Sequence, residues 1–365
     1  MEKQKTVVLG MSGGVDSSVS AYLLKKQGYK VIGVFLRNYP DEESYLDSTC
    51  PFIQDRKFAE SVAKKLKIPF QGVDYRSTYL NKVIKPMFKQ YSKGLTPNPD
   101  IGCNSIIKFP ALWKIAKKHK ADFIATGHYA RIKKSKDGFH LLSGKDKNKD
   151  QSYFLHDLSV QDLSHSLFPI GNLKKTKVRK IAKSLGFPNW DKHGSTGICF
   201  IGKADMKELL KANIKSKPGP VLNPEGKNVG THPGTTYFTI GEKVGPKHNV
   251  KIEDKYRNLV SSKIYVAEKR KNNILVIAPE NHPSLKRKEI IITNLHKINP
   301  KSNLPSKRLK ARIRHLGKLL PGKLTKNKFI LNKPEKGIAP GQSICLYKGK
   351  ELVAAGEIRL PSTTD

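Results

Sequence analysis

Short apolar runs alternate with amphipathic stretches through the first half of the chain. The short runs are rich in β-branched and other apolar residues, which predicts strands at 6–10, 31–36, 69–74 and 122–127. Apolar residues recur every three or four positions between these runs. That spacing predicts helices, one beginning at Val15 and ending at Gly28 and others at 58–66, 79–91 and 106–118. This alternation is typical of βαβ units and a parallel sheet.

The pattern changes near residue 205, where Pro and Gly clusters begin to separate short segments. We expect strands at 274–277, 289–292, 310–314, 328–331 and 343–347. Their spacing suits a small β-barrel or sandwich. The sequence therefore predicts a catalytic domain at 1–205, a small central domain at 206–280 and a C-terminal β-barrel at 281–365.

The charge balance is strongly basic, with a formal net charge of +39 from 69 Lys and Arg against 30 Asp and Glu. Such a balance predicts attraction to a polyanion, and nucleic acid is the first candidate. Drift in an AT-rich genome would also enrich Lys and Asn. Because the basic residues are spread along the whole chain, the charge suggests the class of partner but does not indicate which surface binds it.

The cysteine spacing and the hydropathy of the chain indicate the cellular compartment in which we expect the protein to work. The four cysteines, Cys50, Cys103, Cys199 and Cys345, form no C-x-x-C pair and no Cys/His group at zinc-finger spacing, so we expect no metal-ligating residues. The N-terminus does not resemble a signal peptide, and no run reaches the roughly 18 apolar residues of a membrane span. We expect a cytoplasmic protein with reduced thiols, acting as a monomer without a membrane partner.

A glycine-rich loop follows the first expected strand and precedes the first expected helix. Its sequence is Gly10-Met11-Ser12-Gly13-Gly14-Val15-Asp16-Ser17. Adjacent glycines allow positive φ and bring backbone N–H groups toward an anion, and the following helix directs its positive end to the same place. The loop lacks the lysine of a Walker motif, which disfavours an ordinary P-loop NTPase. The alternative is a Gly-rich turn without a ligand.

Further motifs follow the loop in a fixed order and extend a resemblance over essentially the whole chain. Ser12-Gly-Gly-Val-Asp-Ser17 is similar to the pyrophosphatase loop of the N-type ATP pyrophosphatases. Four further motifs follow it in the sequence: Thr96-Pro-Asn-Pro-Asp-Ile-Gly-Cys-Asn104, Ala125-Thr-Gly-His-Tyr129, Lys149-Asp-Gln-Ser-Tyr-Phe-Leu155 and Ser195-Thr-Gly-Ile-Cys-Phe-Ile-Gly202. Together they resemble the bacterial and organellar tRNA-specific 2-thiouridylase family.

The resemblance implies a fold and a reaction. The fold is α/β, with a Rossmann-like (adenine nucleotide alpha hydrolase-like) parallel-sheet domain, a small central domain and a C-terminal β-barrel. The reaction is ATP-dependent 2-thiolation of the wobble uridine of lysine, glutamate and glutamine tRNAs, giving AMP and pyrophosphate. The implied cofactors are ATP and Mg²⁺. The residues expected to bind ATP are Gly10, Met11, Ser12, Gly13, Gly14, Val15, Asp16, Ser17, Leu36 and Gly127.

Two cysteines carry the sulfur chemistry that the resemblance implies. Cys199 would hold a persulfide delivered by a sulfur-donor protein, and Cys103 would be the nucleophile that resolves the sulfur bridge. Asp100 would be the general base. Any one cysteine chosen blind is more often a core hydrophobe, but both thiols follow Gly- or Pro-rich segments, so we expect exposed loop settings for them. Cys50 and Cys345 are expected to be non-catalytic.

The resemblance also implies a set of contacts with tRNA and its target base. They are Asn98, Pro99, Asp100, His128, Lys149, Asp150, Gln151, Arg312, Ile313 and Gln342. Alternatives stay open for two of these groups: His128 could be a satisfied core histidine, and the 149–151 segment could be a solvated charge run. A flipped uridine suits such a site, because chemistry on a base requires its removal from the stack.

Two other functions compete with thiolation. One is a pyrophosphatase-loop enzyme acting on another tRNA position or a small substrate, although we expect neither the glutamine amidotransferase domain of guanylate synthesis nor the RNA-binding extension of 4-thiouridine synthases. The other is a non-catalytic RNA-binding relative, which loss of the loop or the thiols would favour. Here both motifs are intact.

Overall fold

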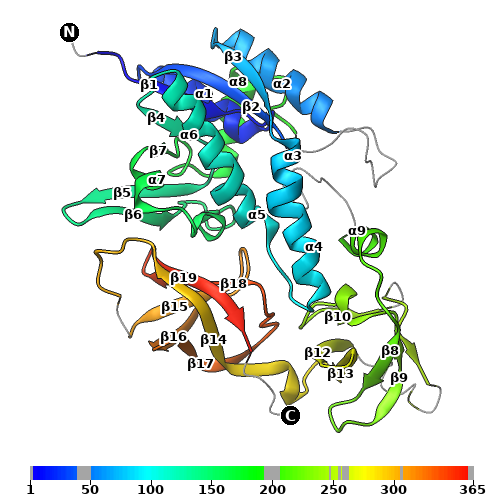
Figure 1. The fold of residues 1–365 in the computed structure, drawn as a ribbon. Helices are drawn as coiled ribbons and strands as arrows, with labels where there is room; N and C mark the ends of the chain where they lie inside the picture. Colours follow the sequence, from blue (N-terminus) through cyan, green and yellow to red (C-terminus); the bar gives the residue numbers. More distant parts are fainter. Residues whose placement is uncertain are drawn as a thin grey trace.

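The computed structural model describes residues 3–38, 51–192, 206–245, 248–253, 256, 263–304 and 307–360. Within these ranges the chain forms a parallel α/β layer, a small central β-sheet and a closed barrel, and the central sheet and the barrel lie beside each other at the same end of the α/β layer (Figure 1). No helix of the described ranges combines the length and the apolar character that a membrane crossing requires.

The N-terminal sheet is fully parallel and has the strand order β3-β2-β1-β4-β7. Its members are β1 (Thr6–Gly10), β2 (Lys30–Arg37), β3 (Phe70–Asp74), β4 (Phe123–Ala125) and β7 (Ser166–Leu167). The chain proceeds outward from β1 in one direction and then returns to β4 on its other side. Ligands of open α/β sheets bind at such a switch point, beyond the carboxyl ends of the two strands. The four strands expected from the sequence in this half are confirmed.

Helices cover both faces of this sheet because the strand side chains alternate between two cores. Val7 and Leu9 enter one of these cores, whereas Val8 enters the core on the opposite face. The helices of this layer are α1 (Val15–Lys26), α2 (Pro51–Lys65), α6 (Phe109–Lys118), α7 (Val160–Ser164) and α8 (Lys175–Ser184), with a 3₁₀ turn η3 (Ser152–Leu155). The expected helices are confirmed, and Gly28 ends the first one at φ +87°.

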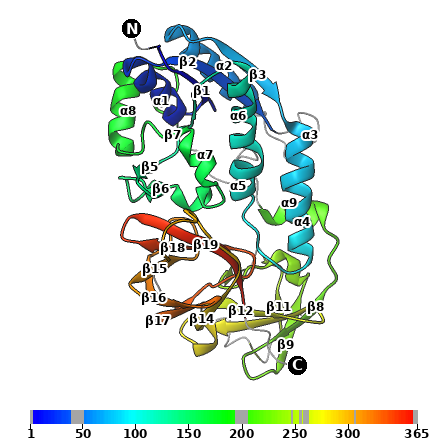
Figure 2. The ribbon, with the colours of Figure 1, turned by 60° about the vertical axis from the view of Figure 1, so that its left-hand side comes forward.

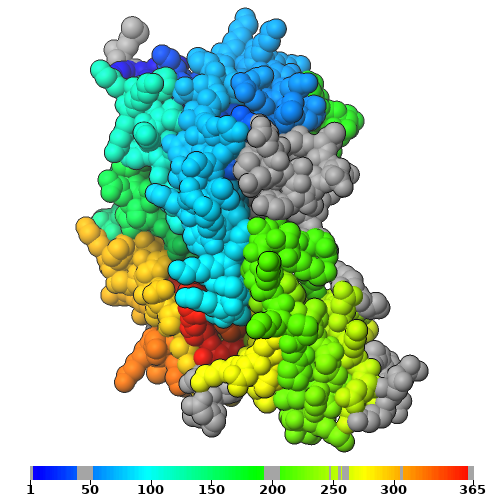
Figure 3. Space-filling model, turned by 45° about the vertical axis from the view of Figure 1, so that its right-hand side comes forward, coloured from blue at the N-terminus to red at the C-terminus, as the bar shows by residue number. Residues whose placement is uncertain are grey.

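Two helical rods descend from the sheet toward the other domains (Figures 1 and 2). One consists of α3 (Arg76–Tyr79), a π-helical turn η1 (Leu80–Ile84) and α4 (Lys85–Ser92); the other consists of α5 (Pro99–Gly102), a π-helical turn η2 (Cys103–Lys108) and α6. Leu209 and Leu210 of α9 (Met206–Asn213) pack into the core between the rods. The space-filling view shows the first rod, in cyan, running down to the green central domain (Figure 3).

The central domain is a six-stranded sheet of order β10-β12-β13-β8-β9-β11. Its strands are β8 (Gly219–Leu222), β9 (Asn228–His232), β10 (Lys243–Val244), β11 (Lys251–Ile252), β12 (Ile264–Arg270) and β13 (Ile274–Pro279), with the 3₁₀ turns η4 (Thr235–Tyr237) and η7 (Pro283–Leu285) beside them. Its own core includes Val229, Phe238 and Leu275.

The C-terminal barrel closes because β14 pairs with both β17 and β19. Its six strands are β14 (Lys286–Lys297), β15 (Leu309–Arg312), β16 (Leu320–Thr325), β17 (Lys328–Lys336), β18 (Ser343–Lys348) and β19 (Glu351–Arg359). The sequence identified the barrel but not β16 or β19.

A hairpin of the N-terminal half, in a region where no strand was expected from the sequence, extends the barrel sheet. Strand β5 (Ala130–Ser135) pairs with β6 (Gly138–Ser143), and β6 pairs with β19 through Leu141 and Leu142. One hydrophobic core accordingly contains side chains of both domains, including Leu141 and Tyr347. The two domains are therefore joined by backbone pairing as well as by packing.

Candidate active site

The glycine-rich loop occupies the switch point between β1 and β4, where a phosphate site is expected. Gly13 has φ +73°, and a Cβ there would lie 2.1 Å from the backbone oxygen of Asp55, so only glycine fits. Gly14 precedes α1 in extended conformation and has no side chain with which to cap the helix. The first amides of α1 are thus suited to an anion.

Gly127 lies against this loop from the end of β4. A Cβ at position 127 would come 2.7 Å from the backbone nitrogen of Ser17 and 2.9 Å from the carbonyl carbon of Asp16. The structure therefore brings together two segments that the sequence separates by more than a hundred residues. Met11, Val15 and Leu36 are buried, so Met11 and Val15 offer the loop's ligand only their backbone. ATP binding by these residues stays a prediction.

The hydroxyls of the loop are mutually hydrogen bonded. The backbone nitrogen of Ser12 donates to Ser17 Oγ at 3.2 Å, and Ser17 Oγ donates to the Gly14 carbonyl at 3.0 Å. Asn189, which lies more than 170 residues later in the sequence, also binds this turn. Its Nδ2 donates to the Gly13 carbonyl at 2.8 Å and to Ser18 Oγ at 3.0 Å. These hydrogen bonds join the loop to itself and to the segment that contains Asn189.

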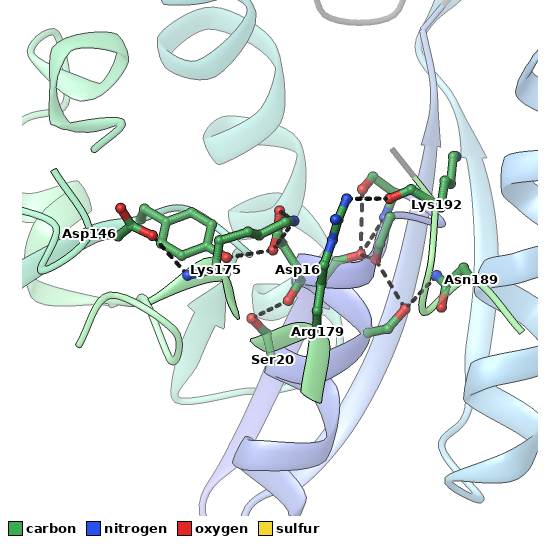
Figure 4. A network of polar contacts seen from close by, with 12 residues as sticks. Asp16, Ser20, Asp146, Lys175, Arg179, Asn189 and Lys192 are labelled. Carbon is green, nitrogen blue, oxygen red and sulfur yellow. Dashed lines mark hydrogen bonds and ion pairs between the residues drawn. The ribbon is translucent and has the colours of Figure 1, made fainter. Parts of the chain in front are cut away.

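Asp16 carries the charge at the mouth of the loop and is bound by two groups (Figure 4). Lys175 Nζ, from the first turn of α8, lies 2.6 Å and 2.7 Å from the two carboxylate oxygens. The Tyr129 hydroxyl donates to Asp16 Oδ1 at 2.8 Å. Burial and the neighbouring Asp16 charge raise the pKa of Tyr129, which keeps it a hydrogen-bond donor. Asp146 accepts from the Lys175 backbone nitrogen at 2.8 Å and fixes the helix start.

Arg179 lies one turn after Lys175 on α8 and faces the same loop (Figure 4). Its Nη2 donates to the Lys192 carbonyl at a long 3.5 Å, and its buried Nε has no hydrogen-bond partner among the described residues. The Lys192 ammonium forms an ion pair with Asp55. A buried guanidinium nitrogen without an acceptor is suited to an incoming anion.

Sequence reasoning missed Lys175, Arg179 and Asn189. The signal for the first two is their four-residue spacing, which places both cations on one face of α8. The loop lacks its own lysine, and these two cations supply positive charge from a distant helix. Asn189 gave no comparable signal.

The thiol of Cys103 is in a different setting from the one expected. It lies at the start of η2 inside a continuous helical rod and is fully buried beside Tyr79, Ile107 and Leu210. The prediction of an exposed loop is therefore wrong: the Pro-Asn-Pro segment initiates a helix here, because Pro99 occupies its first turn and the Asn98 side chain accepts from the Asp100 backbone nitrogen at 3.1 Å.

The structure describes some of the other residues expected at the thiol site and the other cysteines, but not all of them. Asp100 lies in α5, three residues before Cys103, and its carbonyl accepts from Asn104 Nδ2 at 3.0 Å. Cys199 and Cys50 lie outside the described residues. Cys345 is buried in the core shared by the barrel and the N-terminal domain, and burial raises the pKa of its thiol, which fits the expected non-catalytic role.

A groove of about 290 Å³ opens beside the Cys103 segment at the seam between the N-terminal domain and the barrel. Asn98, Pro99 and Gly102 line one side, and Gly341 and Ser343 line the other. Two of the expected target-base residues therefore face a cavity.

A clamp from the barrel holds the segment that leads into this groove. Thr96 donates its backbone N–H to the Pro340 carbonyl at 2.8 Å, and Gln342 Nε2 donates to the Thr96 carbonyl at 2.8 Å. Gly341 has φ +89°, and a Cβ there would lie 2.8 Å from the Thr96 nitrogen. Gln342 is thus bound within the protein, and its contact with tRNA stays a prediction.

Three further residues expected to contact tRNA have internal partners. Asp150 and Arg312 are almost completely buried and form an ion pair at 2.6 Å that joins the N-terminal domain to β15. Ile313 is 3% exposed and belongs to the barrel core. In this structure none of these side chains is presented to solvent, because each fills the domain junction or the barrel.

The remaining expected contacts divide between core and surface. His128 is buried, shares a hydrogen bond with Thr126 Oγ1 at 2.7 Å and stacks on Phe109. Burial, assisted by the Lys108 charge, places the pKa of His128 well below its usual value. The structure therefore matches the alternative of a core histidine. Gln151 Oε1 accepts from the Tyr129 nitrogen at 3.0 Å, and Lys149 is exposed.

Three family models match consecutive parts of the chain. The model described as "tRNA methyl transferase HUP domain" matches residues 5–203, the model described as "tRNA methyl transferase PRC-barrel domain" matches 207–279, and the model described as "Aminomethyltransferase beta-barrel domain" matches 287–358.

Relatives of similar length match over almost the whole chain. A "tRNA-specific 2-thiouridylase MnmA 1" from Geobacillus kaustophilus is 41% identical and covers 94% of this chain and 93% of its own length. A "tRNA-specific 2-thiouridylase MnmA 2" from Aliarcobacter butzleri is 38% identical and covers 98% and 99%. Among solved structures, an NMN synthetase from Francisella tularensis is 19% identical, covers 55% of this chain and 69% of that one, and gives a TM-score of 0.36.

Proposed function

The chain belongs to the family of tRNA-specific 2-thiouridylases, and from that premise we propose that it uses ATP to place sulfur on C2 of a tRNA uridine. The observation that carries the proposal is the phosphate cradle, in which Gly13 and Gly127 leave no room for a side chain and Lys175 and Arg179 bring positive charge. The descriptions of two family models name a methyl transferase. A methyl transfer would not require a phosphate-binding loop, so it leaves this cradle unexplained.

The first step activates the C2 oxygen of the uridine. That oxygen attacks the α-phosphorus of ATP, the bond to the β-phosphate breaks, and pyrophosphate leaves with the electron pair. The α1 amides and the two α8 cations stabilise the charge that develops on the leaving pyrophosphate. Lys175 would exchange part of its contact with Asp16 for phosphate. Asp16 is the carboxylate at the loop that fits a Mg²⁺ held by the phosphates, which would neutralise their charge.

The second step exchanges oxygen for sulfur. The terminal sulfur of a Cys199 persulfide attacks C2, and AMP departs with the former C2 oxygen. The Cys103 thiolate then attacks the Cys199 sulfur, which releases the 2-thio group and leaves a Cys103–Cys199 disulfide. A dithiol reductant supplies the two electrons that restore both thiols. Asp100 would accept the proton that the Cys103 thiol loses.

Burial of Cys103 adds a requirement to this scheme. A fully buried thiol is closed to solvent, so it can attack only a sulfur that lies against the η2 segment or reaches the thiol when that segment opens. We propose that tRNA binding at the adjacent groove exposes it, with Asn98 and Pro99 contacting the target base. The π-helical turn at Cys103 is a suitable place for such a change, because one residue in excess of the α-helical repeat is already accommodated there.

The nucleosides of cellular tRNA test this function. A strain lacking the gene receives the wild-type chain, Cys103→Ala, Cys199→Ala or, as the matched buried-thiol control, Cys345→Ala. Mass spectrometry of digested tRNA should detect 2-thiouridine with the wild type and the control and lose it with the other two. Persistence of 2-thiouridine with both Cys103→Ala and Cys199→Ala would contradict the thiol mechanism.

A purified reaction tests the nucleotide step separately. With uridine-containing tRNA, the wild type should form AMP and pyrophosphate in equal amounts, and Lys175→Ala should slow this by about 100-fold or more. Lys177→Ala, which changes an exposed lysine on the same helix, is the control. Equal rates for Lys175→Ala and the wild type would remove Lys175 from the ATP site.

A further inference from the structure

Two histidines and an aspartate converge at the groove, away from the phosphate loop. His156 and Asp157 follow η3 of the N-terminal half, and His296 lies near the end of β14 in the barrel. One donor atom of each of the three side chains lies within 4.8 Å of the other two. The cluster spans the junction of two domains, and His156 and His296 are 140 residues apart in the sequence.

The imidazole of His156 is arranged like a metal ligand. Its Nε2 lies 2.9 Å from Ser343 Oγ, which fixes the ring. Its Nδ1 is buried and lies 2.8 Å from Asp157 Oδ1, yet the two atoms do not have hydrogen-bond geometry. A metal-binding histidine commonly uses one nitrogen for the ion and the other for an oxygen of the protein.

His296 presents a second unusual contact. Its Nδ1 lies 3.1 Å from the Asn294 carbonyl, and its Nε2 lies 3.0 Å from the His156 carbonyl. A neutral imidazole has a single N–H and can donate to only one of these two oxygens. If Nδ1 donates, the lone pair of Nε2 faces an oxygen, and a cation between the two would turn repulsion into attraction.

The separations of Asp157 from the two histidines agree with one coordination shell, and the three donor atoms all lie within 4.8 Å of one another. Binding one ion requires the two histidine nitrogens to lie no more than about 4.2 Å apart. Ligands about 2.1 Å from a metal ion are separated by about 3.0 Å at right angles and about 3.4 Å in a tetrahedron. The observed separations are 2.8 Å from His156 Nδ1 to Asp157 Oδ1, 3.0 Å from His296 Nε2 to the His156 carbonyl, and 3.7 Å from His296 Nε2 to Asp157 Oδ1.

We propose that His156, Asp157 and His296 bind a divalent transition-metal ion of the Zn²⁺ class. Two imidazoles and one carboxylate are ligands that such ions share, whereas Mg²⁺ and Ca²⁺ prefer oxygen alone. Asp157 and His296 are each 40% exposed, so the site is open to solvent and keeps a position for water. The ion ties β14 to the segment after η3, beside the groove that Asn98 lines.

Cobalt(II) is the probe, because its visible absorption reports the ligand type. Chelator-treated protein is titrated with Co²⁺ as the wild type and as a Cys50→Ser, Cys103→Ser, Cys199→Ser variant, which removes every thiol except that of the buried Cys345. One ion per chain should bind to both with nitrogen and oxygen ligands only. His296→Ala and Asp157→Asn should each weaken binding by at least about tenfold, and His119→Ala, an exposed histidine elsewhere, should bind as the wild type does.

Two results would overturn the proposal. One is the absence of a nitrogen and oxygen cobalt spectrum in the triple serine variant, whose remaining thiol is the buried Cys345, because the cluster would then be a simple ion pair. The other is unchanged affinity in both His296→Ala and Asp157→Asn with the native circular dichroism retained. His296 is partly exposed, so its loss leaves the barrel intact. The readout is metal binding, and a negative result leaves the thiolation proposal unaffected.

Discussion

Arg312 offers a direct choice between two roles, because the family resemblance implies a contact with tRNA and the structure shows a buried ion pair. Its side chain is 9% exposed and that of Asp150 is 2% exposed, with 2.6 Å between Nη1 and Oδ2. Arg312→Met keeps the apolar packing over the Tyr347 ring and removes the charge. Asp150 would then be a buried carboxylate without its cation.

The cost can be estimated from the partners that remain. Removing one member of a buried pair costs about 3–5 kcal/mol. Asp150 Oδ1 would still accept from the backbone nitrogens of Gly144 at 3.0 Å and Ser152 at 3.1 Å, so we expect the lower end, about 3 kcal/mol. Adding Asp150→Asn removes the buried charge and should restore about 1–2 kcal/mol, since a neutral amide with an unmet donor costs less than a bare carboxylate.

Urea unfolding and tRNA binding together decide between the roles. Unfolding of the wild type, Arg312→Met and the double variant is followed by circular dichroism and by tryptophan fluorescence, because a multidomain chain need not unfold in one step. Lys310→Met, an exposed change on the same strand, is the control and should stay within about 0.5 kcal/mol. A destabilisation under about 1 kcal/mol combined with a tenfold loss of tRNA affinity would refute the structural role.

Three other perturbations test single contacts. Gly127→Ala places a Cβ 2.7 Å from a backbone nitrogen of α1, so AMP formation should fall about 100-fold; an unchanged rate would separate the β4 end from the ATP site. Gln342→Ala removes the bond to the Thr96 carbonyl, so sulfur transfer should slow up to about tenfold at constant tRNA affinity, whereas a weaker affinity would indicate direct RNA contact. Burial opposes protonation of His140, but the hydrogen bonds to Glu351 and Asp137 and the charges of these two carboxylates together outweigh it and raise the pKa of His140. The stabilisation from His140 is therefore fully present below about pH 6.5 and is lost as the pH rises through the raised pKa. Melting temperature should therefore fall from about pH 6 to about pH 8 more in the wild type than in Glu351→Gln, and parallel curves would contradict this.

Local pattern was sufficient for the elements of the parallel sheet and for the loop. The first strand, the glycines and the helix after them are adjacent in sequence, so their geometry follows from local propensity and steric freedom. The same reasoning failed for Cys103. A Pro-Asn-Pro-Asp segment is equally compatible with a turn and with a helix start, and packing of the following residues against Tyr79 and Leu210 favours the helix.

The hairpin at 130–143 shows a second limit. Its strands are short and its charged residues conceal the alternation, and it is stable because β6 finds the edge of β19 more than two hundred residues later. No local signal contains that partner. The same holds for Asp150 and Arg312, which read separately as surface charges and are buried only because each neutralises the other.

The sequence by itself determined the family, the order of the domains and the position of the glycine-rich loop between the first strand and the first helix, because these depend on residue types at fixed spacing. Only the tertiary structure decided which charges face the loop, that Cys103 is buried, and that the barrel holds the segment before it through Gln342. These facts depend on contacts between residues far apart in the chain. Such contacts are selected by the free energy of the whole fold rather than by neighbours in sequence.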